Sequence, residues 1–190
     1  NNEFVNRYDY NPIEHIKSRL KTADSIVKKL KKDGHDVTIE NMMEHLSDIA
    51  GIRIICSFTS DIYQIAEMIA HQADVTVLKD YIKNPKPNGY KSYHMVVTVP
   101  VYLSDGPVET KVEVQIRSVA MDFWASLEHK IAYKFEGNAP ENLLKELKAC
   151  ADIVDMLDAK MFSLNEAITA YAAEQRRQEQ QAAKTEEEFL

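Results

Sequence analysis

The sequence predicts an α+β fold, in which helices flank a mixed β-sheet and a helical extension follows at the C-terminal end. Three observations carry this prediction. Short β-branched segments alternate with helical patterns over residues 12–134, residues 111–117 alternate strictly between polar and apolar side chains, and residues 143–171 repeat an apolar residue every three or four positions. The chain has 190 residues, 45% of them hydrophobic, and can therefore bury a core without disulfides or a structural metal.

The first element is expected to be a helix within residues 12–32. Asn11 followed by Pro12 is typical of a helix N-terminus, and the apolar residues that follow lie near helical spacing, with a possible restart near residues 22–24. Gly34 is expected to end this helix. The next three elements are a short helix over 39–46, a buried strand over 52–56, and a helix over 60–69 that begins at Ser60 or Asp61.

The second half is expected to complete the sheet. Strands are predicted over 75–78 and 94–101, separated by a loop at 83–90 that is dense in turn formers. A helix is predicted over 119–134, and more helix after a break at 137–140. Between them, a strand over 111–117 places Val112, Val114 and Ile116 on one face and Lys111, Glu113, Gln115 and Arg117 on the other.

Acidic side chains on the central strands are candidates for a metal site. Asp48 lies just before the strand at 52–56, and Glu113 lies on the polar face of the strand at 111–117. Mg²⁺ favours one or two carboxylates together with substrate phosphate oxygens, so these two carboxylates could hold it. The alternative is a solvated face that binds nothing.

The loop at residues 83–90 is a candidate nucleotide site. It carries Tyr90 beside a turn at Asn88, with several lysines and His94 around it. An exposed ring can stack on a base while ammonium groups take the phosphates. A lysine-rich surface loop whose tyrosine packs down is an equally weighted alternative.

Charge and cysteine content exclude several classes of protein. The net charge of −7 argues against a chain that coats nucleic acid or anionic lipid, whereas the basic segments 14–33 and 79–94 fit a compact polyanion such as a nucleotide. Cys56 and Cys150 match no metal spacing, so two core thiols in a reducing, cytoplasmic compartment are expected. No window approaches the apolar length of a membrane span, so no membrane association is expected.

The C-terminal segment has its own pattern. From Leu143 to Tyr171, apolar residues are spaced alternately by four and three, which is an a/d heptad stripe. So narrow a stripe favours a subunit interface, and folding back onto the sheet is the alternative. The predicted division is a domain over 1–137, a helical oligomerisation extension over 138–175, and a polar tail over 176–190 that is expected to be disordered.

Four segments together resemble the signatures of the RelA/SpoT-type alarmone synthetase domain. In chain order they are Arg19-x-Lys21-x-x-x-Ser25-x-x-x-Lys29, Asp48-Ile-Ala-Gly-Ile-Arg53, Asp80-Tyr-Ile-Lys-Asn-Pro-Lys-Pro-Asn-Gly-Tyr-Lys-Ser-Tyr-His94 and Glu113-Val-Gln-Ile-Arg117. The resemblance runs over residues 12–134, and the loop and tail are similar to the RelQ type of small alarmone synthetase.

The resemblance implies a nucleotidyltransferase-like fold and a GTP or GDP pyrophosphokinase activity. ATP would donate its β,γ-diphosphate to the ribose 3′-hydroxyl of GTP or GDP, giving pppGpp or ppGpp and AMP. The chemistry agrees, because such a transfer needs charge neutralisation and in-line positioning more than covalent catalysis. Two alternatives are a catalytically weak nucleotide- or RNA-binding regulator on the same scaffold and another nucleotidyltransferase.

The resemblance also assigns roles to individual residues by motif position. Asp48 would bind Mg²⁺, and Glu113 would bind the metal or act as general base on the 3′-hydroxyl. Tyr90 would stack on guanine. The ATP site would comprise Arg19, Lys21, Ser25, Lys29 and Arg53, and the GTP site Lys86, Asn88, Tyr90, His94 and Gln115.

Partners are implied by the same resemblance. RelQ-type proteins are homotetramers, and the heptad stripe is the natural candidate for that assembly. Members of this type are regulated by pppGpp, an activator bound between subunits, and by single-stranded RNA, which can inhibit. Both effectors are expected here by analogy alone.

Overall fold

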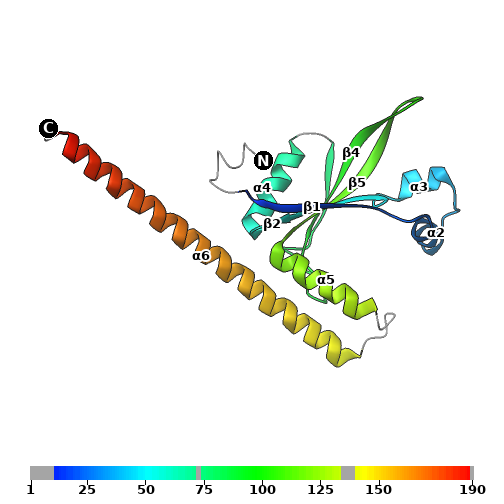
Figure 1. Ribbon diagram of the computed structural model, residues 1–190. Coiled ribbons are helices and arrows are strands. Elements are labelled where there is room, and N and C mark those ends of the chain that lie inside the picture. The colour runs from blue at the N-terminus through cyan, green and yellow to red at the C-terminus, as the bar shows by residue number, and fades with distance from the viewer. Residues whose placement is uncertain (1–10, 72–73, 134–139, 189–190) are drawn as a thin grey trace.

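A mixed five-stranded sheet forms the centre of the molecule in the computed structural model, which describes residues 11–71, 74–133 and 140–188 (Figure 1). The strand order is β1-β2-β5-β4-β3, with β2 parallel to β5 and the other neighbouring pairs antiparallel. The strands are β1 Ile13–Leu20, β2 Ala50–Cys56, β3 Val75–Asp80, β4 Tyr93–Leu103 and β5 Gly106–Ser118.

Helices pack on one face and at the ends of this sheet, which confirms the predicted α+β class. Figure 1 shows α2 and α3 beyond the β1–β2 end, α4 against the sheet, and α5 alongside the long α6. The break predicted at 137–140 lies almost wholly outside the described residues. The helices are α2 Ala23–Lys32, α3 Ile39–His45, α4 Thr59–Ala70, α5 Val119–Tyr133 and α6 Glu141–Glu188.

The first half of the helix predicted over 12–32 is wrong. Residues 13–20 form the edge strand β1, which pairs antiparallel with β2, and helix begins only in α2 after the N-cap Thr22. The apolar spacing of β1 is compatible with a helix, but pairing along the full length of β2 outweighs local propensity. The possible restart near 22–24 is where the helix in fact begins.

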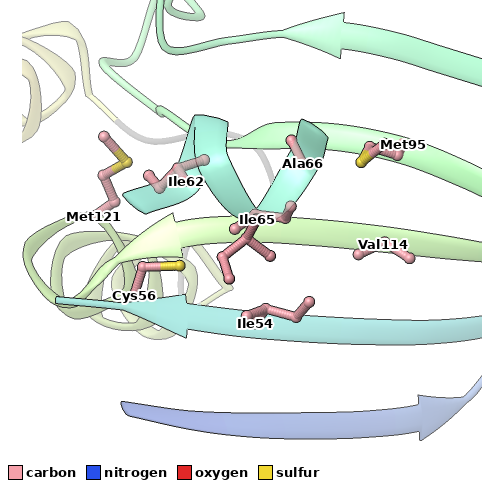
Figure 2. Packing of buried hydrophobic residues seen from close by; sticks show 9 residues of the cluster. Ile54, Cys56, Ile62, Ile65, Ala66, Met95, Val114 and Met121 are labelled. Atoms are coloured by element: carbon pink, nitrogen blue, oxygen red, sulfur yellow. The ribbon is translucent and has the colours of Figure 1, made fainter. Parts of the chain in front are cut away.

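The hydrophobic core lies between the sheet and α4 (Figure 2). Ile62, Ile65 and Ala66 of α4 share one helical face and are buried against the sheet. The Asp61 side chain accepts a hydrogen bond from the backbone N–H of Phe58 and so caps this helix. The sheet supplies Ile54, Cys56, Met95, Val114 and Ile116.

The register of the strands sets two rows of side chains on the face opposite α4. In one row Lys17 pairs with Arg53, Arg53 with Gln115, and Gln115 with His94. In the next row Arg19 pairs with Gly51 and Gly51 with Glu113. Because directly paired residues point to the same face, four strands present charged and polar groups to one surface.

The tail helix α6 is continuous and runs beyond the sheet domain (Figure 1). It packs on the rest of the chain through Ala151, Val154, Asp158 and Phe162, whose ring contacts Phe58 edge-on. The helix reaches Glu188 and so includes residues 176–188 of the predicted polar tail.

The two cysteines differ in their surroundings. Cys56 is a buried core thiol, as predicted, and burial raises its pKa to about 12. Cys150 is exposed on α6, so its assignment to the core is wrong. Across the described part of the chain, no helix combines the length and apolarity needed to cross a bilayer.

Candidate active site

A cavity of about 230 Å³ opens on the polar face, over the first strands of the sheet. The Arg19 side chain lies across Gly51, where a Cβ would come within 3.5 Å of the arginine Cγ. The walls therefore combine two guanidinium groups with one carboxylate, which suits a phosphorylated ligand with a planar base. The lining residues are Lys17, Ser18, Arg19, Gly51, Ile52, Arg53, Glu113 and Gln115.

Of the Arg53 guanidinium nitrogens, Nη1 has a hydrogen-bond partner and Nε has none within the described residues. Its Nη1 donates to Asp122 Oδ1 at 3.3 Å. Its Nε is buried and lacks a hydrogen-bond partner within the described residues. A buried donor without a partner is costly, so a bound ligand that accepts from Nε would recover that cost.

Asp48 sits between two lysines at the edge of this cavity region. Lys21 Nζ lies 2.5 Å from Asp48 Oδ2 and Lys29 Nζ lies 2.9 Å from Oδ1. Burial alone would raise the pKa of Asp48, but hydrogen bonds and charge from the two lysines outweigh it, and the pKa lies below its usual value of 3.8. The carboxylate is therefore ionised at neutral pH.

This lowered pKa predicts how stability depends on pH. The contribution of the Lys21–Asp48–Lys29 ion pairs is present above pH 3.8 and is lost as the pH falls through the lower folded-state pKa. Asp48→Asn is expected to unfold at lower denaturant concentration than the wild type at pH 7. The gap should close towards zero as acid neutralises Asp48 in the wild type.

Urea unfolding of both proteins at pH 7 and in steps below pH 4 checks this expectation. Asp105→Asn, at the exposed tip of the β4–β5 hairpin, is the matched control and should follow the wild type throughout. A gap that widens in acid would contradict the assignment.

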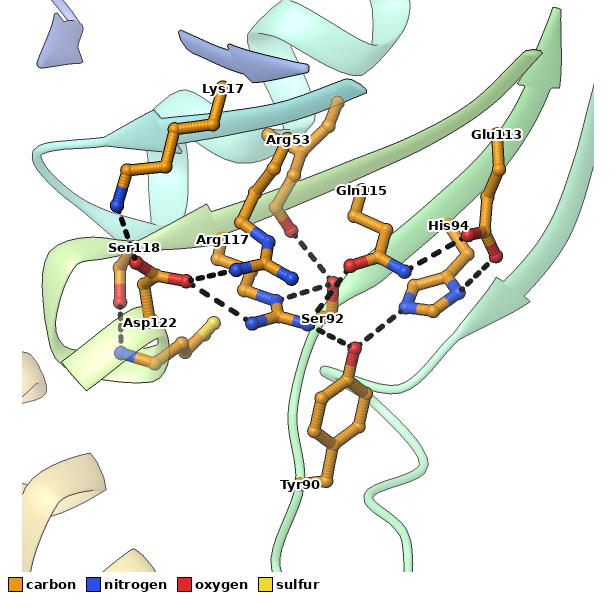
Figure 3. Close-up of polar contacts among 12 residues, drawn as sticks. Lys17, Arg53, Tyr90, Ser92, His94, Glu113, Gln115, Arg117, Ser118 and Asp122 are labelled. Atoms are coloured by element: carbon orange, nitrogen blue, oxygen red, sulfur yellow. Dashed lines mark hydrogen bonds and ion pairs between the residues drawn. The ribbon is translucent and has the colours of Figure 1, made fainter. Parts of the chain in front are cut away.

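Glu113 belongs to both the cavity and a hydrogen-bond network on β4 and β5 (Figure 3). Its Oε1 lies 3.4 Å from His94 Nδ1, and its Oε2 accepts from Gln115 Nε2 at 3.0 Å. The hydrogen bond from His94 is the main cause that lowers the pKa of Glu113, against the opposing effect of burial. The negative charge of Asp48 acts in the raising direction, so the two carboxylates are close enough to interact.

Tyr90 joins the loop to this network through its hydroxyl (Figure 3). Arg117 Nη2 donates to the Tyr90 hydroxyl oxygen at 2.6 Å, which leaves the phenolic proton for His94 Nε2 at 3.0 Å. With Nε2 accepting, the neutral histidine carries its proton on Nδ1, facing Glu113. The ring is half-buried beside Trp124, and Lys86 Nζ lies 4.8 Å from its centroid. Tyr90 is thus neither fully exposed nor fully buried, and its stacking on a base stays a prediction.

The carboxylates of Asp48 and Glu113 are the candidate protein ligands for Mg²⁺. Within the described residues, no cluster of three or more His, Cys, Asp or Glu side chains could enclose an ion. Asp48 and Glu113 are two hard, ionised carboxylates, which fits an ion held mainly by substrate phosphates. Asp48 currently pairs with Lys21 and Lys29, so those lysines would shift towards the phosphates when a metal binds.

Comparison with known proteins identifies the family to which this site belongs. Residues 18–138 match the family described as a region found in RelA / SpoT proteins. Over 163 residues the chain is 48% identical to the GTP pyrophosphokinase YwaC of Bacillus subtilis, a match that covers 85% of this chain and 78% of the relative. The chain belongs to the RelA/SpoT family.

Solved structures of small alarmone synthetases share this RelA/SpoT fold. Small alarmone synthetase 2 of Bacillus subtilis is 46% identical with a TM-score of 0.76, over 87% of this chain and 88% of that one. Small alarmone synthetase 1 of the same organism, solved with its product pppGpp, is 35% identical with a TM-score of 0.78, over 87% of this chain and 85% of that one. The predicted family and fold are therefore confirmed.

The RelA/SpoT site residues predicted from the sequence fall into three groups. Arg19, Arg53, Glu113 and Gln115 line the cavity. Asp48 joins Lys21 and Lys29, and Tyr90 joins Lys86 and His94. The roles themselves stay predictions.

Two predicted site residues lie apart from these groups. Ser25 shares a hydrogen bond with the N-cap Thr22 in the first turn of α2, at 2.9 Å. The Asn88 side chain donates to Glu128 of α5 at 3.2 Å and accepts from the backbone N–H of Tyr90. Both shape the segments that carry the site, and neither lines the cavity.

Sequence reasoning missed two residues at the centre of this RelA/SpoT site, Arg117 and Asp122. Arg117 lies on the predicted polar face of its strand, which was an available signal. Asp122 joins three elements by ion pairs with Arg53, Arg117 and Lys17. Nothing in its local sequence indicates this, because its partners lie on β1, β2 and β5.

Proposed function

We infer that this chain is a GTP pyrophosphokinase that transfers the β,γ-diphosphate of ATP to the 3′-hydroxyl of GTP or GDP. The observation that carries this inference is that Glu113 belongs both to the cavity and to the hydrogen-bond network of Tyr90. It lines the arginine-rich cavity, and through His94 it is also linked to the hydroxyl of Tyr90. One carboxylate thus lies between a site suited to a donor nucleotide and an aromatic platform suited to an acceptor.

The transfer follows from this arrangement. Glu113 accepts the proton of the acceptor 3′-hydroxyl, and the resulting oxygen attacks the β-phosphorus of ATP. The bond between that phosphorus and the oxygen bridging to the α-phosphate breaks, and AMP leaves with the bonding electron pair. Gln115 and His94 orient the carboxylate for this role.

Cationic side chains would neutralise the charge that develops on the phosphates. Arg19 and Arg53 lie at the cavity, and Lys21 and Lys29 can exchange Asp48 for phosphate oxygens. We propose that Asp48 and Glu113 also hold Mg²⁺. When bound, Mg²⁺ would supply positive charge that offsets the negative charge of the phosphates.

Nucleotide resolution after a single incubation tests the activity. The protein is mixed with Mg²⁺, GTP and ATP labelled on the γ-phosphate, and the products are separated. Label on a guanosine product with AMP formed in equal amount is the expected result. Label that stays on ATP would support the alternative of a catalytically weak nucleotide- or RNA-binding regulator. Label released as phosphate alone would support neither reading.

We also propose that a second copy of this chain covers the distal part of the heptad stripe, in a tetramer. The face of α6 that packs on its own domain carries Ala151, Val154, Asp158 and Phe162, of which only Val154 is a stripe position. Exposed large apolar side chains at helical spacing are costly in water. The exposed stripe residues after Val154 are Leu157, Met161, Leu164, Ile168 and Tyr171.

Charge placed on the stripe is expected to reduce the assembly to smaller species. The double variant Leu164→Asp/Ile168→Asp inserts two carboxylates into the proposed seam, and light scattering should report at least a halving of the mass. Thr169→Asp adds a charge one position along, off the stripe, and should keep the wild-type mass. An unchanged mass in the double variant would refute the interface.

The remaining partners are proposed by analogy with the RelQ type. The type-level analogy suggests pppGpp as an activator and single-stranded RNA as an inhibitor, and GTP or GDP as alternative acceptors. Two free cysteines favour a reducing compartment, so the cytoplasm is the proposed location.

A further inference from the structure

Asp122 is a buried carboxylate at the start of α5 and is not among the residues that line the cavity. It is 8% exposed and lies in the first turn of the helix, where the positive end of the helix dipole favours a negative charge. Arg53 Nη1 and Arg117 Nη1 both approach the same atom, Asp122 Oδ1, at 3.3 and 3.2 Å. Lys17 Nζ lies 3.9 Å from Oδ2 (Figure 3).

Arg53 connects Asp122 to the cavity that is proposed to bind the donor nucleotide, ATP. Arg53 lines the cavity together with Arg19, and its buried Nε is unpaired within the described residues. A guanidinium held by a carboxylate through Nη1 is fixed in orientation, because the planar group cannot rotate without breaking that bond. The orientation of the Arg53 side chain at the cavity therefore depends on Asp122.

Arg117 connects Asp122 to Tyr90, which is proposed to bind the acceptor nucleotide. Arg117 is 4% exposed and uses its guanidinium fully: Nη1 binds Asp122, Nη2 binds the Tyr90 hydroxyl and Gln115 Oε1, and Nε binds Ser92 Oγ. Its Cζ also lies 5.0 Å from the centre of the Tyr90 ring. The orientation of Tyr90 therefore depends on Arg117, and that of Arg117 depends on Asp122.

The charge balance makes this dependence strong. Burial is the main cause that lowers the pKa of Arg53, and repulsion by the charge of Arg117 lowers it further. Asp122 lies between the two cations and compensates both. Removal of one partner from a buried ion pair leaves an uncompensated charge, which costs far more than the net worth of the pair.

We propose that Asp122 is a positioning residue for both substrates, because one carboxylate fixes the donor arginine Arg53 and the acceptor arginine Arg117. This inference rests on the proposed function, since it assigns Arg53 to the ATP site and Arg117 to the GTP site. Asp122 touches neither nucleotide and acts only through the two guanidinium groups.

Steady-state kinetics of Asp122→Asn with ATP and GTP varied in turn tests the proposal. The KM values for ATP and for GTP are both expected to rise at least about 10-fold, the loss of one strong charge-assisted hydrogen bond on each side. Two further variants, each of which affects only one of the two nucleotide sites, serve as a comparison for this result. Arg53→Lys should raise the KM for ATP alone, and Tyr90→Phe, which keeps the ring, should raise the KM for GTP alone. Asp105→Asn should leave both values unchanged.

A charge-preserving variant guards against misfolding. Asp122→Glu keeps the negative charge and moves the carboxylate by one methylene, and it should raise both KM values by a smaller factor with a thermal midpoint close to that of the wild type. A rise in one KM alone, or a fall in kcat with both KM values unchanged, would overturn the proposal. A wild-type protein without transfer activity would instead show that the proposed function is wrong.

Discussion

Glu113→Gln is expected to lower the rate of diphosphate transfer by about 10³-fold, within the range that general base catalysis contributes. The pKa of Glu113 is lowered, chiefly by the hydrogen bond from His94, so the carboxylate is ionised at neutral pH and can take the 3′-hydroxyl proton. Glutamine has nearly the same shape and cannot take that proton. Binding of ATP and GTP, measured by calorimetry, should stay within a few fold of the wild type.

Glu109→Gln is the matched control for this experiment. Glu109 lies on the same strand β5, paired with Pro100 in the exposed part of the hairpin, and its replacement should leave kcat unchanged. Transfer by Glu113→Gln at a rate near that of the wild type would remove Glu113 from the role of base. Loss of nucleotide binding with loss of activity would instead favour a metal-holding role.

Tyr90→Ala is expected to raise the KM for GTP by about 5- to 150-fold, which is the range for loss of base stacking on an aromatic ring. The ring is half-buried beside Trp124 and is oriented by Arg117 and His94, so it is a fixed platform. The KM for ATP should change far less, because Arg19 and Arg53 line the cavity and Tyr90 does not.

Initial rates with GTP varied at saturating ATP measure this effect. Tyr102→Ala removes a tyrosine that is 80% exposed on the β4–β5 hairpin and should behave as the wild type. Equal rises in the KM for both nucleotides would mean that Tyr90 acts through the whole network and not as an acceptor platform.

Part of this site could be predicted because its signals are local. The alternation over residues 111–117 predicted the polar face of β5 and placed Glu113 and Gln115 on it, as the register shows. The turn formers at 83–90 predicted the loop that carries Tyr90, and Gly89 in that loop has a φ of 91°. Patterns of two to eight residues reflect the pleat of a strand or the geometry of a turn.

Long-range pairing produced the failures. Residues 13–20 were expected to be helical, and only their pairing with β2 makes them a strand. That change explains Arg19, which would point away from Lys21 and Lys29 in a helix but faces the cavity from β1. Asp122 was missed for the same reason, because its partners come from three strands and two of them, Lys17 and Arg53, lie far from it in the sequence.

Asp48 and Glu113 are expected to act together on ATP and on GTP or GDP, bound with a metal ion between the cavity and Tyr90. The most direct test is a crystal structure with a non-hydrolysable ATP analogue, GDP and Mn²⁺, which anomalous scattering locates. We expect Mn²⁺ to be coordinated by Asp48 and by phosphate oxygens, with a Glu113 oxygen within hydrogen-bond reach of the GDP 3′-hydroxyl. A Mn²⁺ ion bound away from Asp48, or a 3′-hydroxyl that Glu113 cannot reach, would contradict it.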